Sequence, residues 1–287
     1  MIIKVEKSLC YYHRADYDGR CSAAIIKYFD PNVKVIGVDH PASDVDFDDV
    51  DEDTTVYLVD FCLDMGDMKT IKECSKEFIW IDHHHTAIED AKKNNFSTKG
   101  LLSIEKAACR LTWDYIFPKT KEPLAVELIG KFDVWDHNRD TIPFNNGLLV
   151  ERDSYKPYKQ NFWSELFNNN DKVEAILRKG RFLCSYNTII NNQTASMCAF
   201  DTSFEGYKAI AINKPMANSL VFDSVWDSDK YDMEIIFYRH KTNVWKISLY
   251  NPNSDNHINL GELAAKYGGG GHKCAAGFQC SELPFKI

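Results

Sequence analysis

The sequence lacks closely paired cysteines and long apolar runs. Its nine cysteines are scattered, odd in number and never form a C-x-x-C pair, so we expect neither a disulfide framework nor a structural zinc site. No apolar run reaches the roughly 18 residues of a membrane span. The N-terminal stretch M-I-I-K-V-E-K is too short and too charged for a signal peptide, so a cytoplasmic protein without a membrane partner is predicted.

Positive charge is also in short supply. The chain has 34 Lys and Arg against 42 Asp and Glu, which gives a formal net charge of −8. Because phosphate neutralisation dominates affinity for long nucleic acids, this balance argues against a general duplex binder. A short phosphorylated ligand remains compatible, since bound divalent cations would offset local acidic charge.

Strand-like and helix-like segments alternate over the first 85 residues, which predicts a parallel sheet covered by helices. Strands are expected at 9–13, 33–38, 56–60 and 78–82, helices at 19–29 and about 64–76, and a solvated Asp-rich loop from Asp44 to Asp53. Two further helices are expected at 104–117 and 122–132. The region 138–170, rich in Asn, Pro and aromatic residues, has no clear pattern.

A long helical stretch at about 171–198 precedes a second set of strands. The strand-like segments are 208–212, 233–239 and 244–249, with helix-like segments at 217–225 and 260–267. We therefore expect an α/β protein with three parts: a parallel-sheet domain at 1–170, a helical linker at 171–200, and a smaller mixed-sheet domain at 201–287. The chain is long enough for two cores.

The most informative motif is D-H-H-H, Asp82 to His85, directly after the apolar run 78–81. Ionisable residues at a buried strand end are costly to desolvate unless something binds them. A metal ion with an anionic substrate would do so, whereas a surface loop is the plain structural alternative. In an open parallel sheet the strand ends converge on one crevice, where ligands bind.

Two earlier strand ends carry similar residues. His13, Asp16, Asp18 and Gly19 follow the first strand, and Asp60 closes the third. Imidazole with carboxylates suits manganese, iron, cobalt or zinc better than calcium. Asp16 or Asp18 alone could be a helix N-cap, and Asp60 alone a turn residue. In combination these residues suggest a two-metal site bridged by Asp60.

A fourth segment, K-F-D-V-W-D-H-N at 131–138, follows an apolar helix. Either Asp133 or Asp136 could complete the second metal, and Asp133 is the favoured candidate. Near the C-terminus, four consecutive glycines at 268–271 precede His272. Glycines let backbone N–H groups approach phosphate oxygens closely, and His272 could add a donor. A flexible linker is the alternative, but A-A-G-F follows at once and is typical of packed structure.

These motifs together resemble the DHH phosphoesterase superfamily, and G-G-G-G-H-K-C-A-A-G-F resembles the signature of its DHH-associated C-terminal domain. The resemblance covers roughly residues 8 to 279 and implies two manganese ions, with magnesium, cobalt or zinc as alternatives. It implies one ion held by His13, Asp16 and Asp60, and another by Asp18, Asp60, His83 and Asp133. Asp82 would orient a histidine and His84 would act beside the scissile phosphate, so both are expected to be catalytic. His85 lies beyond the motif.

The resemblance also implies substrate contacts from Gly269, Gly270, Gly271 and His272. Relatives often carry a phosphate-gripping arginine upstream of the glycine run, where Tyr250 stands here. Tyr250 could stack on a base instead, and Arg239, His240 and Lys241 could supply the charge.

The function expected from this resemblance is metal-dependent hydrolysis of short RNA or DNA oligonucleotides, including linear dinucleotides, to mononucleotides, as in oligoribonucleases. Alternatives are a single-strand exonuclease, a cyclic-dinucleotide or 3′-phosphoadenosine phosphate phosphatase, a polyphosphate hydrolase, and a catalytically inactive nucleotide-binding regulator. A homodimer is left open.

Overall fold

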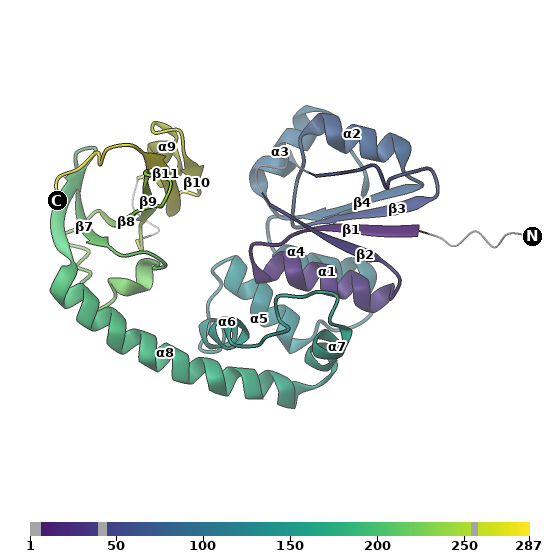
Figure 1. The fold of residues 1–287 in the computed structure, drawn as a ribbon, viewed down its shortest axis with the longest axis horizontal. Helices are drawn as coiled ribbons and strands as arrows, with labels where there is room; N and C mark the ends of the chain where they lie inside the picture. Colours follow the sequence, from purple (N-terminus) through teal and green to yellow (C-terminus); the bar gives the residue numbers. More distant parts are fainter. Residues whose placement is uncertain (1–6, 40–44, 254–257) are drawn as a thin grey trace, which may run out of the picture. The chain divides into compact units, whose positions relative to one another are not determined.

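The computed structural model describes residues 7–39, 45–253 and 258–287, and the chain divides into two compact units (Figure 1). Unit 1 covers Met1–Cys184 and unit 2 covers Ser185–Ile287. The division falls inside one continuous helix, α8, which spans Asn170–Cys198. Among the described residues, no helix is both long and apolar enough to cross a membrane.

Unit 1 is built on a sheet of parallel strands in the order β2-β1-β3-β4-β5, which confirms the predicted α/β class. The strands are β1 Lys7–His13, β2 Lys34–Val38, β3 Thr54–Val59, β4 Glu77–Asp82 and β5 Lys99–Leu102. The short strand β5 was not predicted. The expected Asp-rich loop is free of helix and strand over its described residues 45–53, and Asp44 lies outside them.

Helices cover both faces of this sheet, because successive strand residues point to opposite sides. Leu9 and Tyr11 pack with the core under α2 (Met65–Cys74) and α3 (His85–Lys93). Cys10 and Tyr12 pack with the core under α1 (Tyr17–Phe29) and α4 (Ala108–Ile116). Figure 1 shows these two helical layers on either side of the strands. Burial on both faces explains why the strands read as continuous apolar runs.

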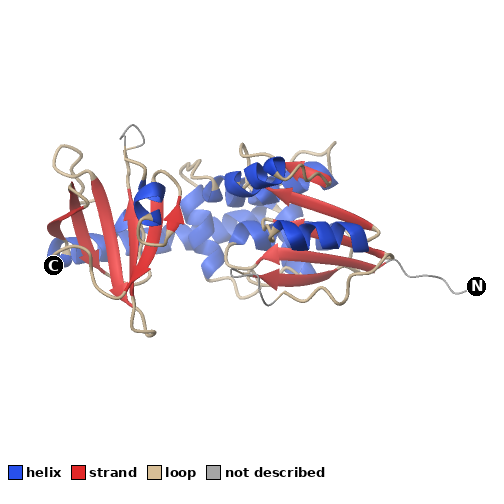
Figure 2. Cartoon of the chain, turned by 90° about the horizontal axis from the view of Figure 1, so that it is seen from above, coloured by secondary structure: helices blue, strands red, loops and turns tan. Residues whose placement is uncertain are grey.

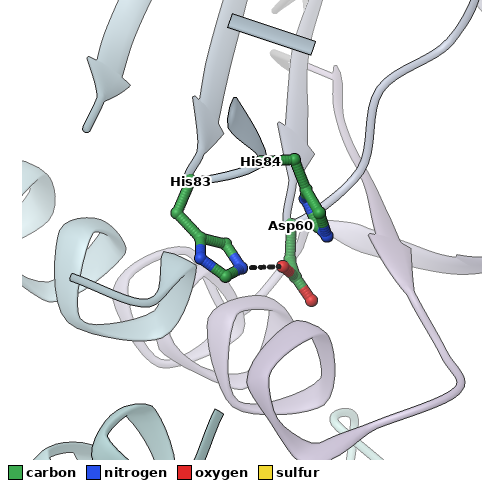
Figure 3. A group of neighbouring side chains, drawn as sticks. All are labelled: Asp60, His83 and His84. Carbon is green, nitrogen blue, oxygen red and sulfur yellow. Dashed lines mark ion pairs between the residues drawn. The ribbon is translucent and has the colours of Figure 1, made fainter. Parts of the chain in front are cut away.

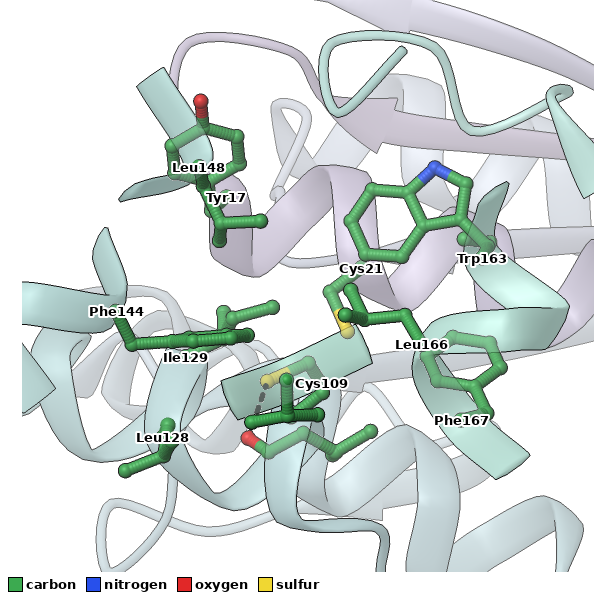
Figure 4. Close-up of a cluster of buried hydrophobic side chains, with 14 of the residues drawn as sticks. Tyr17, Cys21, Cys109, Leu128, Ile129, Phe144, Leu148, Trp163, Leu166 and Phe167 are labelled. Carbon is green, nitrogen blue, oxygen red and sulfur yellow. Dashed lines mark hydrogen bonds between the residues drawn. The ribbon is translucent and has the colours of Figure 1, made fainter. Parts of the chain in front are cut away.

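A further helical core lies against α1 (Figure 4). It is formed by α5 (Leu124–Asp133), α6 (Thr141–Leu149), α7 (Gln160–Asn168) and the start of α8. A Cβ atom on Gly147 would lie 2.3 Å from the Ile176 carbonyl oxygen, so glycine is what lets α6 approach α8 so closely. The region that had no clear sequence pattern therefore contains two helices, α6 and α7, joined by turns.

Unit 2 contains the predicted mixed sheet (Figure 2), and its strands follow the order β10-β11-β9-β8-β7-β6. The strands are β6 Phe200–Phe204, β7 Tyr207–Asn213, β8 Met233–Arg239, β9 Trp245–Tyr250, β10 Gly270–Gly271 and β11 Ala275–Cys280. Among the described strands of this sheet, only the β7–β8 pair is parallel. Helix α9, Leu260–Ala265, packs its buried residues into the core of this sheet.

The prediction of a helix at 217–225 is wrong. The structure has only a single 3₁₀ turn there, η2, Ser219–Val221, begun by the Asn218 side chain accepting a hydrogen bond from the Leu220 amide. Asn, Ser and Asp side chains compete for backbone groups in this way and favour turns over helices. Strand β6 was also missed. It joins β7 through Glu205 and Gly206, both with positive φ, which suits a tight hairpin.

Candidate metal centre

The carboxyl ends of β1, β3 and β4 are neighbours in the sheet, because β3 pairs with both other strands. His13 ends β1, Asp60 follows β3, and Asp82 ends β4. The parallel pairing therefore brings the predicted residues to one edge of unit 1, where such folds bind ligands.

The first group forms where β1 turns into α1. His13 Nδ1 lies 2.9 Å from Asp16 Oδ2, and Asp16 caps the helix by accepting a hydrogen bond from the Gly19 amide at 3.0 Å. The hydrogen bond with Asp16 raises the pKa of His13 to about 10. Burial works against ionisation of Asp16, but the bond with His13 lowers its pKa. Asp16 is thus both the N-cap that the sequence allowed and a neighbour of His13.

Asp18 lies in the first turn of α1 and is 1% exposed. Its two carboxylate oxygens accept hydrogen bonds from the Ala108 amide at 2.8 Å and the Cys109 amide at 2.7 Å. These amides begin α4, where unpaired N–H groups favour an anion. Sequence reasoning missed this support, because residues 90 positions apart meet only in the fold. Burial, reinforced by the charge of Asp60, raises the pKa of Asp18 to about 8.

Asp60 is the most unusual residue of the site. It is 1% exposed and has a left-handed backbone with φ of 54°. Within the described residues, neither of its carboxylate oxygens accepts a hydrogen bond. Burial raises its pKa well above the ordinary value. The next residue is held by the Trp80 indole, which donates to the Phe61 carbonyl oxygen at 3.0 Å, so the buried carboxyl group of Asp60 is fixed in place at a cost.

Two histidines reach toward Asp60 from the end of β4 (Figure 3). His83 Nε2 lies 3.3 Å from Asp60 Oδ1, 3.3 Å from Asp133 Oδ2 and 3.6 Å from Asp18 Oδ2. Asp133 is the last residue of α5, and burial raises its pKa to about 7. Asp136 is exposed and pairs with Lys131 at 3.8 Å. Of the two aspartates that the sequence offered, the fold brings Asp133 into the cluster.

Asp82 is fully buried and organises the motif that follows it. Its Oδ1 lies 2.7 Å from His84 Nδ1 and accepts hydrogen bonds from the amides of His83 and His84 at 2.7 and 3.2 Å. The side-chain bond with Asp82 raises the pKa of His84 to about 9. A carboxylate that holds one imidazole nitrogen leaves the other facing the site. His85 is exposed and begins α3.

Three groups of side chains offer ligand atoms within 4.8 Å of one another: His13, Asp16 and Asp60; Asp18, His83 and Asp133; and Asp60, His83 and His84. We call His13, Asp16, Asp18, Asp60, His83 and Asp133 the ligand cluster. Its oxygens and imidazole nitrogens suit manganese or a similar divalent ion. Buried Asp60 belongs to the first group and contacts His83 of the second, and its oxygens accept no hydrogen bond from the described residues, which fits a carboxylate shared by two cations.

The glycine run of unit 2 has several backbone constraints. Gly268 and Gly271 have positive φ values of 75° and 142°, and a Cβ on Gly269 would lie 2.1 Å from the Gly277 carbonyl oxygen. Gly270 has an ordinary φ and open space where its Cβ would be. Strand pairing and packing therefore account for three of the four glycines, and they leave Gly270 unexplained.

Tyr250 and His272 lie in different surroundings. Tyr250, at the end of β9, packs against Val221, Phe222 and their apolar neighbours, which bury much of its side chain. His272 is exposed, and its amide donates to the Ala275 carbonyl oxygen at 2.7 Å. Tyr250 also pairs across the sheet with Glu234, a buried residue that sequence reasoning passed over.

Comparison with known proteins identifies a domain within unit 2. Residues 218–285 match the model of the DHHA1 domain. An uncharacterised protein of Acanthamoeba polyphaga mimivirus is 24% identical over 261 residues, which cover 84% of this chain. The chain spans only 58% of the length of that relative.

Solved structures show the same fold at low identity. The DHH domain of a protein described as a member of the s1p family of ribosomal proteins matches with a TM-score of 0.62 and 12% identity, over 95% of this chain and 82% of that one. The pGpG-specific phosphodiesterase PggH from Vibrio cholerae matches with a TM-score of 0.56 and 15% identity, over 95% and 92%. An exopolyphosphatase-related protein from Bacteroides fragilis matches with a TM-score of 0.51 and 16% identity, over 98% and 88%.

The parallel sheet of unit 1 and the mixed sheet of unit 2 therefore define a protein with the DHH fold. The family-model match adds that unit 2 contains a DHHA1 domain, which confirms the resemblance that the glycine-rich motif showed.

Proposed function

We propose that this protein is a divalent-metal-dependent phosphodiesterase that hydrolyses short oligonucleotides and linear dinucleotides to mononucleotides. The observation that carries the proposal is the buried carboxylate of Asp60, which accepts no hydrogen bond from the described residues and lies near the imidazoles of His13 and His83. Such a group is expensive to maintain, and phosphoester hydrolysis with two metals is a chemistry that uses it.

The ligand cluster would hold two cations. His13, Asp16 and Asp60 would bind one, and Asp18, Asp60, His83 and Asp133 the other, with manganese as the preferred ion and magnesium, cobalt or zinc as alternatives. When bound, the ions supply a hydroxide from water near neutral pH and neutralise charge on the phosphoryl oxygens.

His84 would donate a proton or hydrogen bond to the phosphate or to the leaving oxygen. Its Nδ1 is held by Asp82, and the hydrogen bond to that carboxylate raises the pKa of the ring and so favours its protonated form. A protonated imidazole with one nitrogen fixed is a suitable general acid. The grouping of His84 with Asp60 and His83 makes a ligand role the alternative for this residue.

Unit 2 would contribute to holding the substrate. Gly270 lacks a packing reason to be glycine, which fits close approach of a phosphate to the backbone, and His272 is exposed beside it. Gly269 and Gly271 would shape the same turn. Tyr250 could offer only the exposed part of a partly buried ring to a base.

A short nucleotide substrate is favoured over a long one by charge. The formal net charge of −8 gives little attraction for a long polyanion. The similarity in fold to a pGpG-specific phosphodiesterase adds support for a dinucleotide. A single-strand exonuclease, a phosphatase for cyclic dinucleotides or 3′-phosphoadenosine phosphate, and an inactive nucleotide-binding regulator are the alternatives.

The test is hydrolysis of a 5′-labelled RNA length series, from dimer to 24-mer, with manganese. We expect mononucleotide release that is fastest on dimers to pentamers and lost in His83→Ala. The matched control is His85→Ala, which changes an exposed histidine two residues along the same motif and should retain activity. Equal or faster cleavage of the 24-mer would instead favour the exonuclease, and no cleavage of any length would contradict the proposal.

A further inference from the structure

A cavity of about 270 Å³ opens beside the ligand cluster within unit 1. Three of the cluster's aspartates, Asp16, Asp18 and Asp133, line one part of it. We call this cavity the side pocket. A group attached to a phosphate at the cluster would therefore have an adjacent space to enter. Its volume is near the lower end of the ~300–1,000 Å³ typical of small-molecule sites, which fits one base rather than a stacked pair.

The other walls of the side pocket are largely aromatic and uncharged. Tyr17, Phe132 and Tyr155 contribute rings, and Asn145 contributes a side-chain amide. Aromatic faces stack on any nucleobase, and an amide can both donate to and accept from a base edge. This combination is the chemistry that recognises a nucleoside.

Arg20 is the only cation among the pocket-lining residues that the structure describes. Its guanidinium lies over the rings of Tyr17 and Tyr155, 5.2 and 4.9 Å from their centroids, and donates to the Arg14 carbonyl oxygen. These cation–π contacts stabilise the positions of the two rings in the pocket wall. Beyond the ligand cluster, a polyphosphate chain in this pocket would place its charges against aromatic and uncharged side chains, so the walls argue against that substrate.

We propose that the side pocket binds the nucleobase of the nucleotide whose phosphate lies at the ligand cluster, with Tyr155 as its stacking face and Asn145 as its base-edge contact. This inference rests on the proposed function and adds to it that unit 1 itself selects nucleotides over other phosphoesters. Tyr17 serves the wall rather than the ligand, since it is buried and its hydroxyl lies 3.2 Å from Ser154 Oγ. Tyr155 is 42% exposed, its hydroxyl donates to the Leu149 carbonyl oxygen at 3.2 Å, and the exposed part of its ring can meet a ligand.

The experiment measures kcat/KM with manganese for a 5′-phosphorylated dinucleotide and for two analogues in which one base or the other is replaced by hydrogen. Removing the base that occupies the pocket should lower wild-type kcat/KM roughly 10- to 100-fold, as expected for the loss of one stacked base. Tyr155→Ala should lose a similar factor on the full dinucleotide and much less on that one analogue. Asn145→Ala should show the same pattern with a smaller loss.

Two control variants distinguish a specific effect on base binding from a general loss of structure. Tyr155→Phe keeps the ring and should retain most of the activity on the full dinucleotide. Tyr158→Ala removes an exposed ring from the same loop that does not line the pocket, and should behave as wild type. Equal losses for Tyr155→Ala on all three substrates, or no loss on any, would overturn the pocket assignment alone. Absence of dinucleotide hydrolysis by the wild-type protein would overturn the proposed function and the assignment with it.

Discussion

Replacing Asp60 with asparagine should make the metal-free protein more stable and the metal-loaded protein less so. The side chain is buried, and burial raises its pKa well above the ordinary value. In the unfolded chain at pH 7 the carboxyl is ionised, so folding must either bury the charge or take up a proton. An ordinary carboxyl costs about 4 kcal/mol to protonate at pH 7, and this sets the ceiling on what an amide would save.

The amide recovers only part of that amount. Its NH₂ group would lie among His13 and His83 with imperfect hydrogen bonds, and an unsatisfied buried donor costs about 1–3 kcal/mol. We therefore expect Asp60→Asn to stabilise the metal-free protein by about 1–3 kcal/mol. For a unit of this size each kcal/mol corresponds to roughly 2–4 °C in Tm.

In manganese, the wild-type protein should be more stable than Asp60→Asn. If the wild-type protein binds manganese, a concentration 100 times the Kd stabilises it by about 2.7 kcal/mol, whereas loss of the bridging carboxylate should abolish most of that gain. The assay is thermal unfolding at pH 7 in EDTA and in manganese, run beside RNA hydrolysis. Asp136→Asn is the matched control, because Asp136 is an exposed aspartate three residues from Asp133 and outside the cluster.

Two results would refute this reasoning. Asp60→Asn could be less stable than wild type in EDTA, which would mean that the carboxylate supports the fold through interactions other than a cation. Alternatively, the variant could retain the full manganese-dependent rise in Tm, which would mean that Asp60 does not bridge the ions. A parallel loss of metal response in Asp136→Asn would point to a nonspecific effect of charge.

Other regions give independent predictions. Burial raises the pKa of Glu234 to about 8, so the folded state holds a proton that the unfolded state releases above about pH 4.5. Stability should therefore fall as pH rises from about 4.5 to 8, by up to about 3–5 kcal/mol, and chemical denaturation of Glu234→Gln should show a flatter pH profile. Gly269→Ala should destabilise unit 2 by about 1–3 kcal/mol because a carbonyl oxygen blocks the new methyl group, whereas Gly270→Ala should leave Tm unchanged and raise the KM for RNA. His84→Gln should lower kcat about 10²- to 10⁴-fold while the manganese-dependent rise in Tm persists, and loss of that rise would indicate a ligand instead of a proton donor.

The sequence predicted the parts of the fold that have a local pattern. The strands of unit 1 appear as apolar runs because helices bury both of their faces. Helices α6 and α7 escaped prediction because their Asn- and Pro-containing sequence is helical only through packing, as the close approach of Gly147 to Ile176 illustrates. The expected helix at 217–225 failed for the opposite reason, since Asn218 favours a turn over an intrinsically weak helix.

The candidate site likewise combines residues that the sequence predicts with contacts that depend on the tertiary structure. Asp82, His83 and His84 are adjacent in the sequence and directly follow an apolar run. Their position alone therefore predicts ionisable groups that are costly to desolvate. The choice between Asp133 and Asp136 needed the fold, because the two residues lie within one turn of each other and only the end of α5 decides which reaches His83. The support of Asp18 by the first amides of α4 likewise depends on tertiary structure.

Metal ligands can be predicted from this sequence more readily than residues that would recognise a base, and this difference has a physical origin. Residues of the ligand cluster strain the fold: Asp60 combines burial, a left-handed backbone and a carboxylate that accepts no hydrogen bond from the described residues. Residues that recognise a base impose no such cost, because an exposed tyrosine or asparagine is unremarkable at any surface position. Tyr155 and Asn145 therefore carry no motif, and only the cavity that joins them to Asp16, Asp18 and Asp133 gives them a role. Reaction chemistry can thus be predicted from this sequence before substrate choice, and the substrate analogues that lack one base test the second part separately from the first.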